Sequence, residues 1–114
     1  MNIIRRTDSF STSPQISVSD VQALADQGFK TIINNRPDLE SPDQPLSADI
    51  GRRAEELGIN YIAYPVTLST INTEVARKFA EILTCSPTPI LAFCKSGNRS
   101  NHLFQLAKQT HSSL

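Results

Sequence analysis

The stretch PILAFCKSGNRSNHLFQLAKQ, residues 89–109, places a cysteine between an apolar run and a helical pattern. Residues 90–93 are all apolar and follow a proline, which is typical of a short buried strand. A polar loop that contains Gly97 comes next, and Arg99 opens the helical pattern. The sequence therefore predicts that Cys94 lies just past a buried strand and just before a helix.

A thiol in this position is suited to nucleophilic attack on an anionic substrate. A helix N-terminus stabilises the reactive thiolate through its partial positive charge and its unpaired N–H groups. Gly97 lets the backbone curl into an N–H nest, and Arg99 offers a planar fork for two oxygens. We expect Cys94 and Arg99 to be catalytic and Ser100 to donate to the sulfur. We expect the oxyanion to be bound by Lys95, Ser96, Gly97, Asn98, Arg99 and Ser100.

The alternative interpretation is that Cys94 is a small buried apolar residue and Arg99 a solvated helix residue. The order of strand, cysteine, glycine-containing loop, arginine and helix favours a functional loop. Cys85 has no such context and is interpreted as structural. The two cysteines and two histidines do not form a zinc ligand set, so we expect no metal and no cofactor.

Length and composition indicate one domain over residues 1–114. Lysine plus arginine equals aspartate plus glutamate, at 11 each, so no overall field attracts nucleic acid or an acidic membrane. No run approaches the roughly 20 apolar residues of a membrane helix, and the N-terminus does not resemble a signal peptide. We expect a cytoplasmic protein whose partner is a small oxyanion or a phosphorylated substrate; the oligomeric state stays open.

Helical and strand patterns alternate along the rest of the chain. Helices are predicted after a Ser19–Gln22 capping box, after Ser47 and after Asn72, with Gly28 and Gly58 ending the first two. Strands are predicted for residues 31–35, 61–66 and 90–93, after a weak β-type opening in residues 2–11. This alternation predicts an α/β fold with a mainly parallel sheet of four or five strands, flanked by helices.

Ligands of such sheets bind beyond the carboxyl ends of the strands. Three segments follow predicted strands directly: the NNRPD turn at 34–38, the VTLST turn at 66–70, and the cysteine loop. We therefore expect all three to meet at one rim of the sheet.

These segments, together with QISVSDVQALADQGFKTIINNRPDLESPDQP and YIAYPVTLSTIN, resemble the bacterial phosphatase-like family of the beta-lactamase hydrolase-like proteins. The likeness covers roughly residues 3–108. Members of that family occur alone or fused to a metallo-hydrolase domain associated with persulfide oxidation. The resemblance implies the fold of dual-specificity protein tyrosine phosphatases and hydrolysis through a phospho-cysteine at Cys94, with Arg99 and loop N–H groups binding the oxyanion.

Two features depart from the tyrosine phosphatase pattern. Four residues, not five, separate Cys94 from Arg99, and this interval is one that single-domain rhodaneses often show. The general acid is also missing, because residues 67–70 contain no carboxylate. Asp38, or in its place Glu40, is the candidate for a substitute acid if the fold brings it near Cys94; the alternative is that Asp38 is only a turn residue after a proline. Arg36 is open to two interpretations, as an anion ligand or as a residue that fixes its loop.

Two other functions stay open at this point. One is rhodanese-like sulfur transfer through a Cys94 persulfide, which needs no general acid. The other is a non-catalytic module that binds an oxyanion.

Overall fold

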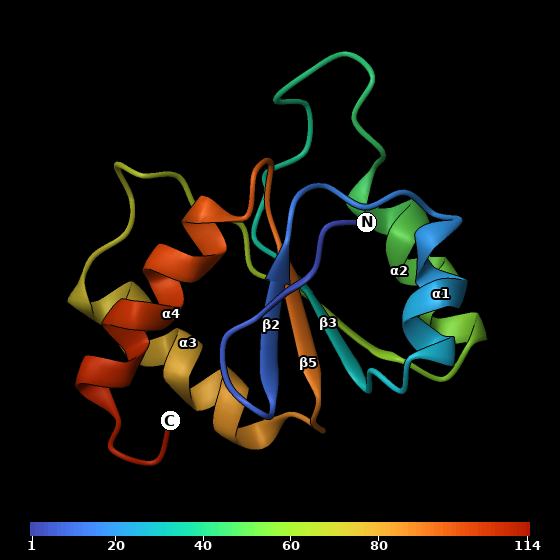
Figure 1. Ribbon diagram of the computed structural model, residues 1–114. Helices are drawn as coiled ribbons and strands as arrows, with labels where there is room; N and C mark the ends of the chain where they lie inside the picture. Colours follow the sequence, from blue (N-terminus) through green and yellow to red (C-terminus); the bar gives the residue numbers. More distant parts are fainter.

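A computed structural model describes residues 1–114 and contains a five-stranded sheet in the order β1-β2-β5-β3-β4. The strands are β1 (Ile4–Arg5), β2 (Phe10–Ser13), β3 (Thr31–Asn34), β4 (Asn60–Ala63) and β5 (Ile90–Phe93). Only the β1–β2 pair is antiparallel. The predicted mainly parallel α/β sheet is confirmed, and β5, which leads to Cys94, is its central strand (Figure 1).

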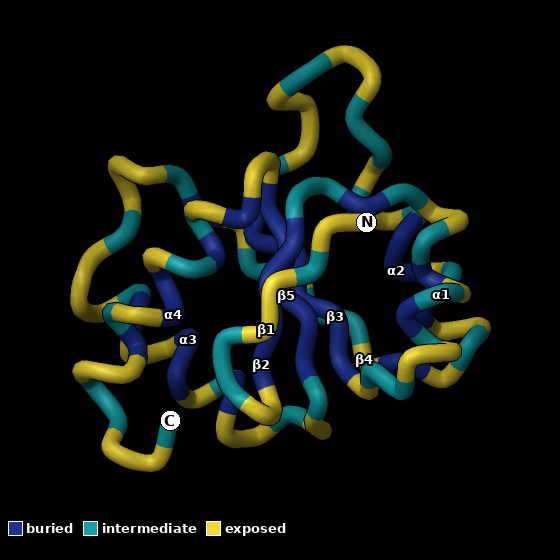
Figure 2. Tube along the Cα trace, viewed as in Figure 1, coloured by how far each residue is buried: buried dark blue, intermediate teal, exposed yellow.

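Helices cover both faces of the sheet. The helices α1 (Asp20–Asp26) and α2 (Ser47–Glu56) lie on one face, and α3 (Thr73–Cys85) and α4 (Asn98–Thr110) on the other (Figure 1). Apolar side chains of β5 alternate between the two cores: Leu91 and Phe93 pack towards α1 and α2, while Ile90 and Ala92 pack towards α3 and α4. Burial is accordingly concentrated in the central strands (Figure 2).

Strand β4 is an edge strand and is shorter than predicted. It ends at Ala63, although the sequence predicted a strand over residues 61–66. Pro65 has no N–H group to continue the ladder. The Tyr64 and Val66 N–H groups still donate to the Asn34 and Asn35 carbonyls, at 2.9 Å each, so the chain continues beside β3 beyond the strand.

Two of the three predicted helix caps are wrong in detail. The capping box of α1 is formed by Ser17 and Asp20, not by Ser19 and Gln22: Asp20 N–H donates to Ser17 Oγ at 3.2 Å, and Ser17 N–H donates to Asp20 Oδ2 at 2.8 Å. The Ser19 backbone is already helical, so its side chain does not cap α1.

The start of α2 is capped from a distant part of the chain. The Ser47 side chain does not cap this helix, because Ser47 is its first residue; the Ser47 N–H donates to Asp38 Oδ1 at 2.9 Å. The third prediction is confirmed, since Asn72 Oδ1 accepts from Val75 N–H at 2.9 Å at the start of α3.

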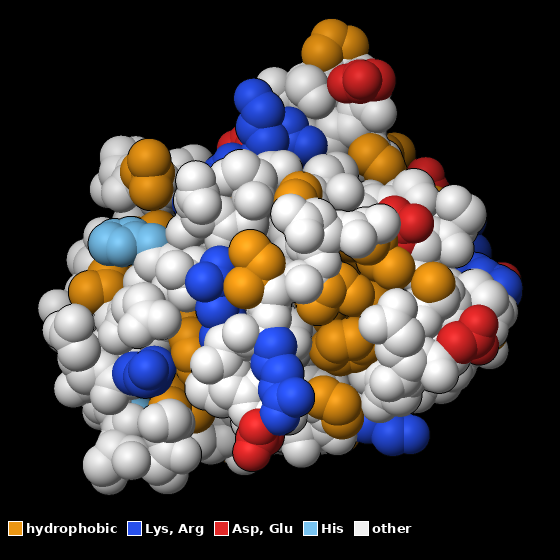
Figure 3. Space-filling model, viewed as in Figure 1, with side chains coloured by type: hydrophobic (Ala, Val, Ile, Leu, Met, Phe, Trp, Pro, Cys, Tyr) orange, Lys and Arg blue, Asp and Glu red, His pale blue; other side chains and the backbone are white.

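No helix of the structure has the length and apolar character needed to span a membrane. The loop that joins β3 to α2 projects from the carboxyl rim of the sheet (Figure 1). Charged side chains of both signs lie in small separate groups on the face shown in Figure 3, with Lys and Arg side chains at the base of this projecting loop.

Candidate active site

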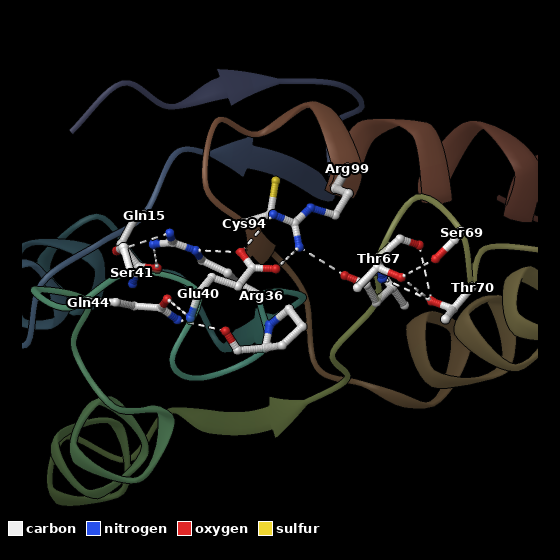
Figure 4. Close-up of polar contacts among 12 residues, drawn as sticks. Gln15, Arg36, Glu40, Ser41, Gln44, Thr67, Ser69, Thr70, Cys94 and Arg99 are labelled. Carbon is white, nitrogen blue, oxygen red and sulfur yellow. Dashed lines mark hydrogen bonds and ion pairs between the residues drawn. The ribbon is translucent and has the colours of Figure 1, made fainter.

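Three loops meet at the carboxyl rim of the sheet, as the sequence predicted. The cysteine loop, residues 94–97, follows β5; the projecting loop, residues 35–46, follows β3; and the hydroxyl loop, residues 66–71, follows the extension of β4. Arg99 contacts residues of both other loops, so it joins the three segments (Figure 4). The rim is therefore a single site built from distant parts of the chain.

Cys94 lies at the end of the central strand and is 1% exposed. Its sulfur accepts a hydrogen bond from the Gly97 N–H at 3.1 Å. Gly97 is the N-cap of α4 and has φ 94°, a left-handed conformation that a residue with a Cβ atom adopts only with strain. The glycine thus turns the chain so that its own N–H group, at the start of α4, points at the cysteine sulfur.

Further N–H groups around the cysteine are open to an anion. The backbone N–H groups of Lys95, Ser96, Arg99 and Ser100 have no hydrogen-bond partner within the protein. The Asn98 N–H is bound to Ser96 Oγ at 3.3 Å. Unpaired N–H groups at a helix start attract negative charge. Four N–H groups of the predicted cradle are thus unpaired, whereas Asn98 contributes no free N–H group; that the loop binds an oxyanion stays a prediction.

Arg99 is held by two acceptors that leave one edge of its guanidinium free. Its Nη1 and Nη2 atoms donate to Glu40 Oε2 and Oε1, at 2.9 Å each, and Nη1 also donates to the Val66 carbonyl at 3.0 Å. A guanidinium carries five N–H groups. The two that remain, Nε–H and the outer Nη2–H, form a side edge that can bind two oxygens.

Electrostatic contacts keep both partners of this pair ionised. The hydrogen bonds of Glu40 raise the pKa of Arg99, and the nearby charge of Cys94 also contributes. The hydrogen bond from Arg99, with the second one from Arg36, lowers the pKa of Glu40 to about 2 although partial burial opposes this. Glu40 is therefore a carboxylate, and not a carboxylic acid, at neutral pH.

Arg36 supports Glu40 from the other side. Its side chain is 5% exposed, and its Nε donates to Glu40 Oε1 at 2.9 Å. Its Nη1 donates to Gln15 Oε1 at 3.1 Å. Of the two interpretations that the sequence left open, the contacts favour the second: Arg36 fixes the projecting loop and its glutamate (Figure 4).

Asp38 is not the carboxylate that the structure brings to Arg99. Its Oδ1 accepts the Ser47 N–H at the start of α2, and Glu40 occupies the place beside Arg99. Asp38 is oriented by the start of α2, which it caps, and its role as a substitute acid stays a prediction. A hollow of about 220 Å³ beside Asp38 includes Arg36 but neither Cys94 nor Arg99.

Ser100 does not donate to the sulfur. Its buried hydroxyl donates to Asn35 Oδ1 at 2.8 Å, and the Asn35 side-chain amide donates to the Tyr64 carbonyl at 2.9 Å. The Asn35 N–H donates to the Phe93 carbonyl at 2.8 Å. Asn35 therefore ties the projecting loop to the end of β5, to the first turn of α4 and to the chain after β4. Only the Ser100 backbone N–H is left for an anion.

Sequence reasoning missed the roles of Gln15 and Asn35 and placed too little weight on Glu40. The spacing of Arg36 and Glu40, four positions apart, was a signal that these two residues could pair. It did not indicate that Glu40 also binds Arg99, which lies 59 positions after it in the chain. Lys95 is exposed and contributes positive charge at the rim. No three His, Cys, Asp or Glu side chains come together in a way that could hold a metal ion.

Comparison with known proteins identifies relatives over nearly the whole chain. The family model for the beta-lactamase hydrolase-like protein, phosphatase-like domain, matches residues 3–111. A beta-lactamase hydrolase-like protein of Agrobacterium fabrum is 33% identical over 108 residues, which are 95% of this chain and 25% of that protein. One of Xylella fastidiosa is 29% identical with the same coverage. The chain thus spans about a quarter of these curated relatives.

Solved structures with a similar fold include a candidate phosphatase and a PP-IP phosphatase. A candidate phosphatase from Neisseria meningitidis is 33% identical with a TM-score of 0.85, covering 91% of this chain and 74% of that one. P. aeruginosa TpbA in complex with phosphotyrosine has a TM-score of 0.72 at 16% identity, covering 96% and 65% of the two chains. The S. cerevisiae PP-IP phosphatase Siw14 has a TM-score of 0.67 at 17% identity, covering 96% and 75%. The last two show likeness of fold alone.

Proposed function

The chain belongs to the phosphatase-like domain family of the beta-lactamase hydrolase-like proteins, and from this we propose that it hydrolyses phosphate monoesters or related phosphoryl compounds through a phospho-cysteine at Cys94. In the first step the Cys94 thiolate attacks phosphorus and the leaving group departs. In the second step water attacks phosphorus, the S–P bond breaks, and phosphate and the thiolate are released.

Each element of the rim has a part in this reaction. The open N–H groups at the start of α4 bind the equatorial oxygens of the phosphoryl group, and the free edge of Arg99 binds two of them. The Gly97 N–H stabilises the thiolate before attack and again when it leaves. Glu40 is a positioning residue that fixes the plane of the Arg99 guanidinium.

The observation that carries the proposal is the free side edge of Arg99 beside a buried cysteine at a helix start. A salt bridge that served only for stability would not need an arginine with one edge held and the other left open at the cysteine loop. The fold shared with a candidate phosphatase and with a PP-IP phosphatase supports the same reaction.

Sulfur transfer is the second candidate, and two observations favour it. The Cys94–Arg99 loop has four intervening residues, and the hydroxyl loop holds no carboxylate. A Cys94 persulfide could be formed and passed on without a general acid. The non-catalytic alternative has no observation of its own in the geometry.

Parallel assays on one preparation test the choice. Wild-type protein is assayed with an aryl phosphate and with thiosulfate plus cyanide, and Cys94→Ser and Cys85→Ser are assayed beside it. We expect phosphate release that Cys94→Ser abolishes and Cys85→Ser leaves unchanged, since Cys85 is exposed at the end of α3, which precedes β5, whereas the rim follows β5. Sulfur transfer that exceeds phosphate release by orders of magnitude would overturn the proposal in favour of the second candidate.

A further inference from the structure

Each carboxylate of the projecting loop already has a hydrogen-bond partner within the protein, and none is free beside Arg99. Asp38 accepts the Ser47 N–H at the start of α2, and Asp43 accepts the Ser41 hydroxyl at 3.2 Å. Glu40 is bound to two arginines, and its pKa is lowered to about 2. A group with this pKa carries no proton at neutral pH, so it cannot protonate a leaving group.

The hydroxyl loop offers no proton donor either. The Thr67 hydroxyl donates to Thr70 Oγ1 at 3.2 Å, the Thr70 hydroxyl donates to the Thr67 carbonyl at 3.1 Å, and Ser69 Oγ lies 3.1 Å from Thr67 Oγ1 (Figure 4). Hydroxyl groups that bind one another fix the shape of the loop. They do not supply an acid of the strength that catalysis at neutral pH requires.

From these contacts we propose that the site acts on phosphoryl groups whose leaving group departs as an anion without being protonated. Compounds of this class are phosphoanhydrides, acyl phosphates and aryl phosphates. This inference rests on the proposed phospho-cysteine reaction and names its substrate class. Simple alkyl phosphates fall outside the class, because an alkoxide is too basic to leave unprotonated.

The chemical step balances without a general acid. The Cys94 thiol first loses its proton to solvent; the thiolate then forms the S–P bond while the bond from phosphorus to the leaving oxygen breaks, and the leaving group takes the electron pair. Water cleaves the S–P bond, and its proton passes to a phosphate oxygen or to solvent. General acid catalysis typically contributes ~10²–10⁴-fold to the rate. Without it, substrates with poor leaving groups should react more slowly than those with good leaving groups by a similar factor.

The test is a leaving-group series assayed at constant pH. The substrates are aryl phosphates with graded leaving-group basicity, acetyl phosphate, inorganic pyrophosphate and an alkyl phosphate. The quantity compared is kcat/KM, which reports the steps up to departure of the leaving group. We expect kcat/KM to fall steeply as the basicity of the leaving group rises across the aryl series, which defines the slope of the series. We expect kcat/KM for the alkyl phosphate to be at least ~10²-fold lower. The relative rates of acetyl phosphate, pyrophosphate and the aryl esters then identify which member of the class the site prefers.

Variants separate the role of Glu40 from that of an acid. Glu40→Gln should lower kcat/KM by the same factor for every leaving group, because it loosens Arg99 without removing a proton donor. His102→Gln, at an exposed position on α4, should leave the slope unchanged, as should the matched surface variant Glu81→Gln. A shallow wild-type slope that becomes steep in Glu40→Gln or His102→Gln would identify that residue as the acid and overturn the inference.

Failure of the inference can be distinguished from failure of the reaction itself. A shallow slope with Cys94-dependent turnover contradicts the substrate class and leaves the phospho-cysteine route in place. Turnover of all substrates that survives Cys94→Ser, or turnover of none, contradicts the phospho-cysteine route and the inference with it.

Discussion

Glu40 binds Arg99 through both of its carboxylate oxygens, at 2.9 Å each, and leaves the Nε edge of the guanidinium free. The two residues are 59 positions apart in the chain, on the projecting loop and on the first turn of α4. The pair therefore sets the position of the projecting loop and the orientation of the arginine at the same time. Arg36 and Gln15 extend the same network away from the cysteine.

Arg99→Lys should lower kcat/KM for an aryl phosphate by at least ~10-fold. A lysine is a single point of charge and cannot bind Glu40 and two oxygens of a phosphoryl group at once. Steady-state kinetics measure the loss. Arg77→Lys is the matched control, because Arg77 also pairs with glutamates but lies exposed on α3. Equal kinetics for the two variants would remove Arg99 from the oxyanion site.

The stabilising effect of Glu40 should depend on pH in a defined window. Its pKa is lower in the folded protein, about 2, than the ordinary 4.5 of an unfolded chain. The unfolded state therefore binds a proton first as the pH falls, and folding stability decreases. The contribution is fully present above about 4.5 and is lost as the pH approaches 2.

Urea unfolding of wild-type protein and Glu40→Gln at several pH values measures this contribution. The difference between their free energies of unfolding should be constant at pH 6–7 and shrink steadily below pH 4.5. A difference that stays constant down to pH 2.5 would show that Glu40 gains nothing from the two arginines.

Gly97→Ala should weaken anion binding, and the loss should be larger than the accompanying loss of folding stability can account for. The left-handed φ of 94° makes alanine unfavourable by roughly 1–2 kcal/mol, and its Cβ would lie 3.4 Å from the Ser13 backbone. Relief of this strain would move the N–H group that donates to Cys94. Gly58→Ala is the control, since Gly58 has φ 74° with no atom within 4 Å of the added Cβ and lies far from the rim.

We expect both alanine variants to lose comparable stability and only Gly97→Ala to lose phosphatase activity. Phosphatase assays and thermal unfolding of the same samples compare the two. Full activity in folded Gly97→Ala would argue against a role for the Gly97 N–H group.

Ser100→Ala should destabilise the protein by about 1–3 kcal/mol, because it leaves the buried Asn35 Oδ1 without its hydroxyl partner. Denaturant unfolding is the measurement, and Ser112→Ala at an exposed position is the control. If the two variants unfold at the same denaturant concentration, the Ser100–Asn35 bond does not connect the loops as described.

The fold was accessible from the sequence because its signals are local. The apolar run at residues 90–93 and the β-branched run at 31–33 indicated strands, and the glycines at 28 and 58 indicated helix ends. The Asn72 cap was predicted correctly for the same reason, since donor and acceptor are three residues apart. The capping box at α1 was misplaced by two residues because serines stand at 17 and at 19, and only the backbone angles distinguish them.

The site was only partly accessible, because its key contacts join distant residues. The position of Cys94 and Arg99 at a strand–helix junction followed from order in the chain. The partner of Arg99 did not: Asp38 and Glu40 lie on the same loop, and which one reaches Arg99 depends on the α2 terminus that captures Asp38. The hydroxyl of Ser100 was assigned to the sulfur because Asn35, 65 positions away, was not known to approach it.

In the proposed reaction, Cys94 carries the phosphoryl group during turnover. Rapid quenching of the reaction with an aryl phosphate, followed by mass spectrometry of the peptide that contains Cys94, tests this directly. We expect a phosphoryl adduct on Cys94 that appears with the first burst of leaving group and is absent in Cys94→Ser. A burst of leaving group without any adduct on Cys94, or steady turnover by Cys94→Ser, would contradict it.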